Sequence, residues 1–223
     1  MSGVFVAGTD TGVGKTLAAC VLLHALRRRH ARVVGMKPVA AGAVRVGNDW
    51  TSDDAMALRA ASSIAVPCEL DNPVLLPEPM SPHLAAQRAG VPIEIDRIVA
   101  SYGQLAERAD AVVVEGAGGF LVPLSARETG ADLAQALGLP VVLVVGLRLG
   151  CLNHALLTAE AIRARGLRLA GWICNRIDAH MLQPEDNIAY LRAHLAVPLL
   201  ADIGFSAKPD PRAVSVHLPP DWA

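Results

Sequence analysis

The segment that most constrains this chain lies near its start, where an apolar run leads into a glycine-rich loop. The run Val4–Ala7 is followed by Gly8-Thr9-Asp10-Thr11-Gly12-Val13-Gly14-Lys15-Thr16 and then by an apolar helical pattern. In such a loop, backbone N–H groups and the helix N-terminus bind phosphate, the lysine reaches the β- and γ-phosphates, and the threonine hydroxyl ligates Mg²⁺. We therefore predict a phosphate-binding loop (P-loop) that holds a nucleotide.

One residue of this loop departs from the general pattern. Gly8 lies one position too early for G-x-x-x-x-G-K-[ST], because Thr9 stands where the first glycine is expected. A glycine-rich turn without chemical meaning is the alternative, but the agreement of strand, Gly-Lys-Thr and helix favours nucleotide binding. The loop residues predicted to bind the nucleotide are Asp10, Thr11, Gly12, Val13, Gly14, Lys15 and Thr16.

Short, continuous apolar runs predict strands that are buried on both faces. They are Val4–Ala7, Val33–Met36, Ala111–Val114, Val141–Val145 and Ala170–Cys174. Helical patterns lie between most of them, at Thr16–Arg29, Asp53–Ala61, Ile95–Ala109, Leu152–Arg165 and about Pro184–Leu195. This alternation predicts an α/β fold with three layers and a doubly wound, mainly parallel sheet. We expect loops at Ala40–Asn48 and Asn72–Pro92, the latter with a short helix after Ser81-Pro82, and an irregular, proline-rich tail from about residue 207.

Length and composition exclude several classes of protein. The 223 residues fit one domain, 1–223, and the hydrophobic content of 52% is ample for a large core. A formal net charge of −1 gives no reason to expect nucleic acid. No apolar run is long enough to span a membrane, and the first residues lack the features of a signal peptide, so we expect a cytoplasmic protein. The four cysteines and seven histidines show no transition-metal spacing, so any metal should be Mg²⁺ held by oxygen atoms.

Three further residues carry charge at predicted strand ends or helix starts. Glu115 follows the strand Ala111–Val114 and precedes Gly116-Ala117-Gly118-Gly119, so its carboxylate could hold the metal at the edge of the sheet. Asp54 is either a further metal ligand or an ordinary first-turn residue of a helix, and its position alone leaves both open. Lys37 ends the strand Val33–Met36 and should point toward the same phosphate pocket, unless it is a surface lysine.

Together these motifs resemble dethiobiotin synthetase, a family of P-loop NTPase-like fold. The residues that carry the resemblance span about residues 4 to 206 and keep their order throughout: Gly8-Thr9-Asp10-Thr11 with Val13-Gly14-Lys15-Thr16, Lys37-Pro38-Val39 with Gly42, Ser81-Pro82-His83, Val114-Glu115-Gly116-Ala117-Gly118-Gly119, Gly150-Cys151-Leu152-Asn153-His154, and Gly171-Trp172 with Asn175. The early Gly8 looks like this family's own form of the loop.

The resemblance implies an ATP-dependent cyclo-ligase of biotin biosynthesis. Such an enzyme closes a cyclic urea from 7,8-diaminononanoate and CO₂ and gives dethiobiotin, ADP and phosphate. An amine takes up CO₂ as a carbamate, the carbamate attacks the γ-phosphate to form a carbamic-phosphoric anhydride, and the neighbouring amine closes the ring by expelling phosphate. No covalent enzyme intermediate is needed, so positioning and charge neutralisation should provide most of the catalysis.

The resemblance also assigns roles to individual residues. Lys37, Lys15 and Thr11 would be catalytic, and Thr16, Asp54 and Glu115 would hold Mg²⁺. Beyond the loop, ATP would contact Gly116, Ala117, Gly118, Asn175 at the adenine edge, Arg176, Gly204, Phe205 and Ser206. The diamine would contact Thr11, Lys37 and Ala41, and its carboxylate would bind Gly150, Cys151, Leu152 and Asn153 of the second subunit of a homodimer. The start of a helix at Gly150 independently suits a carboxylate, although an ordinary helix cap fits it as well.

Two positions depart from the family pattern, and two other functions are alternatives. Ala41 and Gly12 stand where relatives often carry a hydroxyl and an acid, so two side-chain contacts to the substrate are lost. A ParA/MinD-like nucleotide switch would have an extra lysine five residues before Lys15, where this chain has Asp10. A cobyric acid synthase would need a glutaminase domain, for which no length remains. Both comparisons favour the synthetase.

Overall fold

A parallel sheet of six strands forms the centre of the computed structural model, which describes residues 3–47 and 49–222. In spatial order its strands are β10 (Leu199–Ile203), β9 (Leu169–Arg176), β8 (Val141–Leu147), β1 (Gly3–Gly8), β7 (Ala111–Glu115) and β2 (Val33–Met36). Each neighbouring pair is parallel, as the continuous apolar runs predict. The five predicted strands are confirmed, with ends that agree to within two residues.

Strand β1 lies inside the sheet, with β2 and β7 on one side of it and β8, β9 and β10 on the other. Its C-terminal end is therefore at the point where the strand order changes direction. Its partners come from far along the sequence: Gly3 pairs with Val112 of β7, and Phe5 pairs with Val141 of β8. In open α/β sheets, a ligand binds beyond the carboxyl ends of the strands at such a switch point. The P-loop that follows β1 is therefore placed in the crevice where a nucleotide would be expected.

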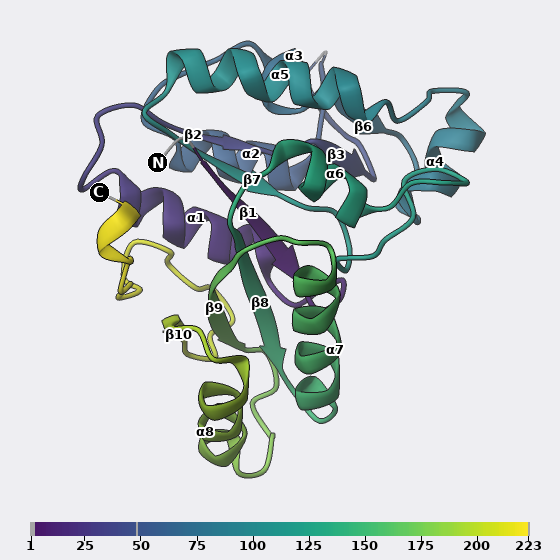
Figure 1. Cartoon of the computed structure of the whole chain (residues 1–223). Coiled ribbons are helices and arrows are strands. Elements are labelled where there is room, and N and C mark those ends of the chain that lie inside the picture. Colours follow the sequence, from purple (N-terminus) through teal and green to yellow (C-terminus); the bar gives the residue numbers. More distant parts are fainter. Residues whose placement is uncertain (1–2, 48, 223) are drawn as a thin grey trace.

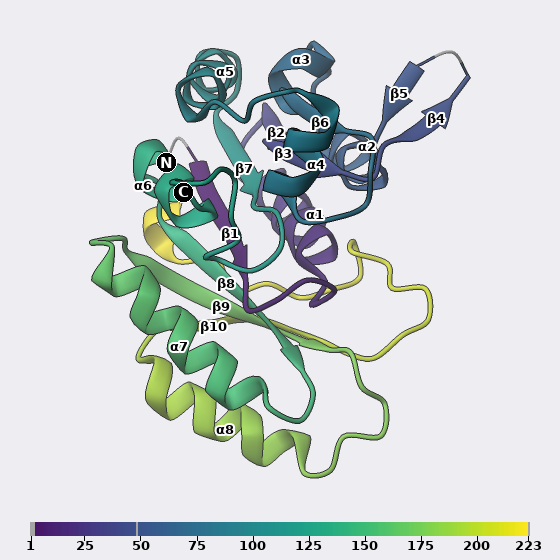
Figure 2. The same cartoon turned by 90° about the vertical axis from the view of Figure 1, so that its right-hand side faces the viewer.

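Helices cover both faces of the sheet, and alternate strand residues pack against each layer. Val4 and Val6 face α1 (Lys15–Leu26) and α2 (Asp53–Ala61), whereas Phe5 and Ala7 face the opposite layer. That layer contains α5 (Ile95–Arg108), α6 (Gly130–Leu137), α7 (Cys151–Ala164) and α8 (Pro184–Leu195). Figures 1 and 2 show α1 on one side of the sheet and α7 and α8 on the other. The three-layer, doubly wound α/β class is confirmed.

Several short elements differ from the predicted loops. Residues expected as the loop Ala40–Asn48 contain the end of β3 (Val39–Ala41) and all of β4 (Val44–Val46), which pairs with β5 (Asp49–Thr51) in a hairpin that projects from the body (Figure 2). The stretch 72–92 contains β6 (Val74–Leu76), which pairs with β3, and the expected short helix, α4 (Pro82–Ala89). Strands of three residues are too short to show a periodic pattern. The short helix α3 (Cys68–Asp71), α6 and β10 were not predicted either.

The segment after β10 has no regular element until the 3₁₀ turn Pro220–Trp222. It nevertheless packs on the outside of α1, where Val214, Val216 and Leu218 lie against the core and Trp222 is 0% exposed. The ring of His30 lies 3.2 Å from the carbonyl of Trp222, so the turn is tied to the end of the first helical segment. Among the described helices, none combines the length and apolarity that crossing a membrane requires.

Candidate active site

The P-loop turns tightly into helix α1 through a residue that only glycine accommodates easily. Gly14 precedes the helix with φ of +87°, in the left-handed region, and its carbonyl accepts the N–H of Ala18. A side chain at Gly14 would also collide with the Asn175 amide nitrogen. The first N–H groups of α1 lack partners within the helix and carry the positive end of its dipole. The loop thus has the anion-binding backbone that the motif predicts.

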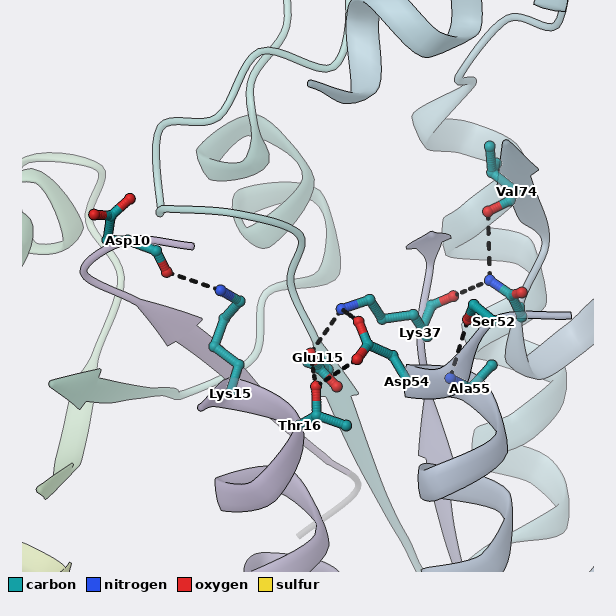
Figure 3. Close-up of polar contacts among 10 residues, drawn as sticks. Asp10, Lys15, Thr16, Lys37, Ser52, Asp54, Ala55, Val74 and Glu115 are labelled. Carbon is teal, nitrogen blue, oxygen red and sulfur yellow. Dashed lines mark hydrogen bonds and ion pairs between the residues drawn. The ribbon is translucent and has the colours of Figure 1, made fainter. Parts of the chain in front are cut away.

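Lys15, the first residue of α1, is buried and held against the loop. Its side-chain Nζ donates to the main-chain carbonyl of Asp10 at 2.9 Å (Figure 3), and the residue is only 7% exposed. Burial, and after it the nearby charge of Lys37, lowers the pKa of Lys15 to about 8. A cation kept in this environment is poorly solvated, and an anion placed beside it would replace the missing water.

Thr16 lies beside two carboxylates that come from distant parts of the chain. Its hydroxyl is 2.7 Å from Asp54 Oδ1 and 2.9 Å from Glu115 Oε1, with one proton to donate between them (Figure 3). The cap of α2 is provided by Ser52, whose Oγ accepts the N–H of Ala55. Asp54 is therefore not the capping residue, and its side chain faces the P-loop.

Lys37 lies between the same two carboxylates. Its Nζ is 2.6 Å from Glu115 Oε1 and 2.7 Å from Asp54 Oδ2, and the residue is 4% exposed. Burial opposes the charge on Lys37, but Glu115 and Asp54 outweigh it, so its pKa is raised. The surface-lysine alternative is wrong. The strand-end rule, which placed Lys37 and Glu115 at one edge of the sheet, is confirmed by these contacts.

Glu115 has one oxygen without a protein partner. The residue is 1% exposed, its Oε1 contacts Lys37 and Thr16, and its Oε2 is buried with no hydrogen bond. Burial raises the pKa of this carboxyl, and the charge of Lys37 opposes the rise. A buried, unpartnered carboxylate oxygen is a feature that a bound cation would satisfy.

A cleft with these groups in its wall opens between the P-loop and the β3–β6 side of the molecule. The predicted site residues that line it are Thr11, Gly12, Gly14, Lys15, Thr16, Lys37, Ala41, Asp54, Glu115, Ala117 and Gly118. Gly116 lines a separate, small apolar pocket next to the cleft, together with Glu115, Ala117 and Gly118. The side chain of Val13 is instead buried in the core. One wall of the cleft is apolar, and its residues Val39, Pro79, Met80, Pro82 and Val122 were not assigned from the sequence.

A second pocket lies at the end of β9, on the other side of the P-loop. It is lined by Leu17, Asn175, Arg176, Ile177, Gly204, Phe205, Ser206 and Pro209, which include all the residues expected around adenine. The amide nitrogen of Asn175 donates to the carbonyl of Val13 at 2.9 Å, which links this pocket to the P-loop. Arg176 is engaged by Asp202 and Glu185, so its guanidinium is fixed at the rim.

The helix start predicted to receive a carboxylate lies apart from the cleft within one chain. Gly150 precedes α7 with φ of +92°, Cys151 is buried, and Asn153 is exposed. Among the described residues that line the cleft, none comes from the range 150–153. The structure does not bring this helix start together with Lys37 in a single subunit.

Sequence reasoning missed a charged partner of the P-loop. Arg148, in the turn between β8 and α7, contacts Asp10 Oδ2 at 2.7 Å, while Asp10 Oδ1 accepts the N–H of Thr11. The two charged residues are 138 positions apart, and nothing in the sequence distinguishes Arg148 from an ordinary surface arginine. The place that a ParA/MinD-like switch would fill with lysine is thus held by an anion paired within this chain.

Comparison with known proteins agrees with this geometry. A family model described as an AAA domain matches residues 2–211. An ATP-dependent dethiobiotin synthetase of Aromatoleum aromaticum is 53% identical over 214 residues, which make up 96% of this chain and 95% of the relative. Another, from Ralstonia nicotianae, is 56% identical over 214 residues, or 96% of this chain and 93% of the relative. The chain belongs to the dethiobiotin synthetase family.

A solved structure connects this dethiobiotin synthetase family member to a wider fold. The cell division ATPase MinD of Pyrococcus furiosus has a TM-score of 0.55 and 18% sequence identity, covering 91% of this chain and 83% of that one. At such low identity the likeness shows the fold alone, and it confirms the P-loop NTPase-like class. The ParA/MinD-like alternative is therefore supported by a similar fold only.

Proposed function

We propose that this chain closes the ureido ring of dethiobiotin from 7,8-diaminononanoate, CO₂ and ATP. Its relatives carry the name of that activity, and one observation of the structure supports it in particular. Two buried lysines, Lys15 and Lys37, face one cleft with two carboxylates, Asp54 and Glu115. Such a site can neutralise the charge of a triphosphate, a metal and a carbamate together, which is what a reaction without an enzyme nucleophile needs.

The nucleotide would bind across the P-loop with its base in the second pocket. Backbone N–H groups from Gly12 to Thr16 would hold the phosphates, and Lys15 would exchange its contact with the Asp10 carbonyl for the β- and γ-phosphates. Asn175 and Arg176 would border the base together with residues 204–206. The contact between Asn175 and Val13 would keep the base and phosphate sites in register.

The oxygen atoms beside the P-loop fit Mg²⁺. Asp54 and Glu115 offer carboxylate oxygens, Thr16 offers a hydroxyl, and Glu115 Oε2 is buried without a partner. Oxygen donors of this kind suit a hard divalent cation. When bound, the ion would neutralise charge on the β- and γ-phosphates.

Lys37 would act on the carbamate, and Thr11 would lie beside the substrate in the same cleft. Lys37 Nζ lies beside the metal-holding carboxylates, so it can donate to a carbamate oxygen that faces the γ-phosphate. The carbamate oxygen would attack phosphorus and ADP would leave; the second amine would then attack the carbamate carbon, phosphate would leave, and the proton lost by that amine would pass to phosphate or water. Lys15 and Lys37 would stabilise the charge that develops in both steps. Ala41 and Gly12 line the cleft without a polar side chain, so recognition of the amines rests on other groups.

A homodimer would complete the site. The diamine carries a carboxylate at the far end of its alkyl chain, and the residues from Gly150 to Asn153 begin helix α7 away from the cleft of their own chain. A second subunit could bring that helix start to the open end of the cleft, where free N–H groups and the helix dipole would bind the carboxylate. The apolar residues Met80, Pro82 and Val122 would contact the alkyl chain between the two ends.

The test is direct formation of the product. The purified protein is incubated with Mg-ATP, bicarbonate and 7,8-diaminononanoate, each component is omitted in turn, and dethiobiotin is measured by mass spectrometry together with released phosphate. We expect dethiobiotin only in the complete mixture, and its loss in Lys37→Ala. The matched control is Arg108→Ala, which removes an exposed cation at the end of α5 and should not change the rate. If phosphate is released at the same rate with and without the diamine and no dethiobiotin forms, the proposal is refuted and a nucleotide switch is favoured.

A further inference from the structure

Two consecutive residues outside the cleft hold the backbone of Lys37. The N–H of Lys37 donates to the carbonyl of Asp71 at 2.7 Å, and Asn72 Nδ2 donates to the carbonyl of Lys37 at 2.7 Å. Asp71 and Asn72 are themselves buried. Both main-chain polar groups of Lys37 are therefore bonded to the turn that ends α3.

The side chain of Asp71 connects this turn to helix α2. Arg59, in the last turn of α2, donates from Nε to Asp71 Oδ2 at 2.7 Å and from Nη2 to Oδ1 at 2.6 Å. Its remaining nitrogen, Nη1, donates to Thr51 Oγ1 at 3.1 Å. Thr51 directly precedes Ser52, the residue that caps the same helix. A two-pronged guanidinium–carboxylate contact restricts both distance and orientation. Arg59 thus fixes the whole of α2 against the Asp71 turn.

Helix α2 connects Arg59 to the cleft, because Asp54 lies in the first turn of the same helix. Asp54 Oδ2 is 2.7 Å from Lys37 Nζ. The path runs from the Lys37 backbone through Asp71 and Arg59 to α2, and from Asp54 back to the Lys37 side chain. Apart from helix α2 itself, the contacts along this path are hydrogen bonds or ion pairs of 2.7 Å or less. A route outside the cleft thus connects the backbone of Lys37 to the helix that carries Asp54.

We propose that Arg59 and Asp71 are positioning residues, which hold Lys37 at its working distance from the metal-binding Asp54. The inference rests on the roles proposed above for Lys37 and Asp54. Neither Arg59 nor Asp71 lines the cleft among the described residues, so their effect on the reaction passes through α2 and the end of β2. A displacement of about 1 Å between reacting groups can lower a rate by about a hundredfold. The pair therefore influences turnover without touching the substrate.

The experiment separates positioning from simple stabilisation. Replacing a buried ion pair by apolar residues of similar volume often preserves stability. The double variant Arg59→Met/Asp71→Leu tests this, and Arg59→Lys, which keeps the charge but loses the two-pronged contact, is a second variant that should fold. The matched control is Arg32→Met/Asp110→Leu, which removes an arginine–aspartate contact of 2.6 Å at the opposite end of β2. Each protein is characterised by melting temperature, kcat and the KM for ATP.

We expect kcat to fall about tenfold or more in both Arg59 variants, with the KM for ATP changed less than about twofold, because the P-loop is unaltered. The control pair should keep the kcat of the unmodified protein. A second readout is Mn²⁺ binding, measured by electron paramagnetic resonance with a non-hydrolysable ATP analogue present. It should weaken about threefold or more in the Arg59 variants, because Asp54 is no longer held in place.

Two results would overturn the inference. One is an Arg59→Met/Asp71→Leu protein with an unchanged melting temperature and an unchanged kcat. The other is an Arg59→Lys protein in which kcat falls only in proportion to the folded fraction while Mn²⁺ binding is unchanged. Failure of the proposed function is recognised separately, since the unmodified protein would then form no dethiobiotin, and Mn²⁺ binding would still report on the position of Asp54.

Discussion

Replacing Lys37 by methionine would remove the cation that lies between the Glu115 and Asp54 carboxylates. The four charged groups of the site, Lys15, Lys37, Asp54 and Glu115, sum to zero when all are ionised. Without Lys37 the same volume holds an excess negative charge, and Glu115 is 1% exposed, so water cannot screen it. Methionine matches the length of the lysine stem and should leave the packing intact. The loss is therefore electrostatic.

The size of the effect follows from the contacts that disappear. Lys37 makes ion pairs of 2.6 Å with Glu115 and 2.7 Å with Asp54, but the Asp54 side chain is 42% exposed, so water screens that contact. The cost therefore comes from the buried Glu115 pair, for which removal of one partner costs about 3 to 5 kcal/mol. Glu115 can relieve a part of this cost by taking up a proton, since burial already raises its pKa. For a chain of this length, 1 kcal/mol corresponds to about 2 to 4 °C in melting temperature. We expect the melting temperature in EDTA to fall by about 6 to 20 °C.

The assay is thermal unfolding followed by circular dichroism, in EDTA and in millimolar Mg²⁺. A divalent cation should replace the missing positive charge, so Mg²⁺ should raise the melting temperature of Lys37→Met more than that of the unmodified protein. Arg108→Met serves as the control for loss of an exposed cation. If Lys37→Met melts within about 2 °C of the unmodified protein in EDTA, or if Mg²⁺ stabilises both equally, the electrostatic account is wrong.

Three further outcomes can be checked. Gly14→Ala should abolish ATP binding in a calorimetric titration, whereas Gly12→Ala, which shares a positive φ but has no atom within 4 Å of the added Cβ, should weaken it far less. The side-chain hydrogen bond from Thr129 contributes most to lowering the pKa of Asp132 to about 2, so this carboxylate stabilises the fold above pH 3.8 and loses that effect as the pH falls toward 2. Urea unfolding at pH 5 and pH 3 should show a smaller stability difference between Asp132→Asn and the unmodified protein at the lower pH. With a thiol reagent at pH 8, Cys68 should react first because the other three thiols are buried, and Cys68→Ser should remove that fast phase.

Much of the site could be predicted because its residues follow strand ends. Lys37 and Glu115 end strands that flank each other in a parallel sheet, and the rule that ligands bind at such ends places both beside the P-loop. Asp54 needed the structure, since a carboxylate in the first turn of a helix has the same sequence signature whether it caps the helix or faces a site. The structure shows that Ser52 caps the helix and that Asp54 faces Thr16 of the P-loop, whereas metal binding by Asp54 stays a prediction.

Other features could not be predicted, because sequence patterns report local structure and not long-range pairing. Arg148 and Asp10, or Arg59 and Asp71, look like ordinary solvated charges until the fold brings them together. The hairpin of β4 and β5 has strands of three residues each, which is below the length at which alternation becomes visible. The unexpected strand β10 includes the exposed Asp202, which interrupts its apolar run.

The position of β1 inside the sheet determines how early the chain can fold during its synthesis. This strand is synthesised before the other described strands, yet its two neighbours are β7, which begins at residue 111, and β8, which begins at residue 141. At elongation rates of about 5 to 20 residues per second, β8 is complete roughly 7 to 30 seconds after β1. Until β7 is made both edges of β1 are unpaired, and the edge that pairs with β8 stays unpaired to the end of that interval, which is the condition that favours chaperone binding or aggregation. The nascent chain therefore carries its P-loop sequence long before it can bind a nucleotide.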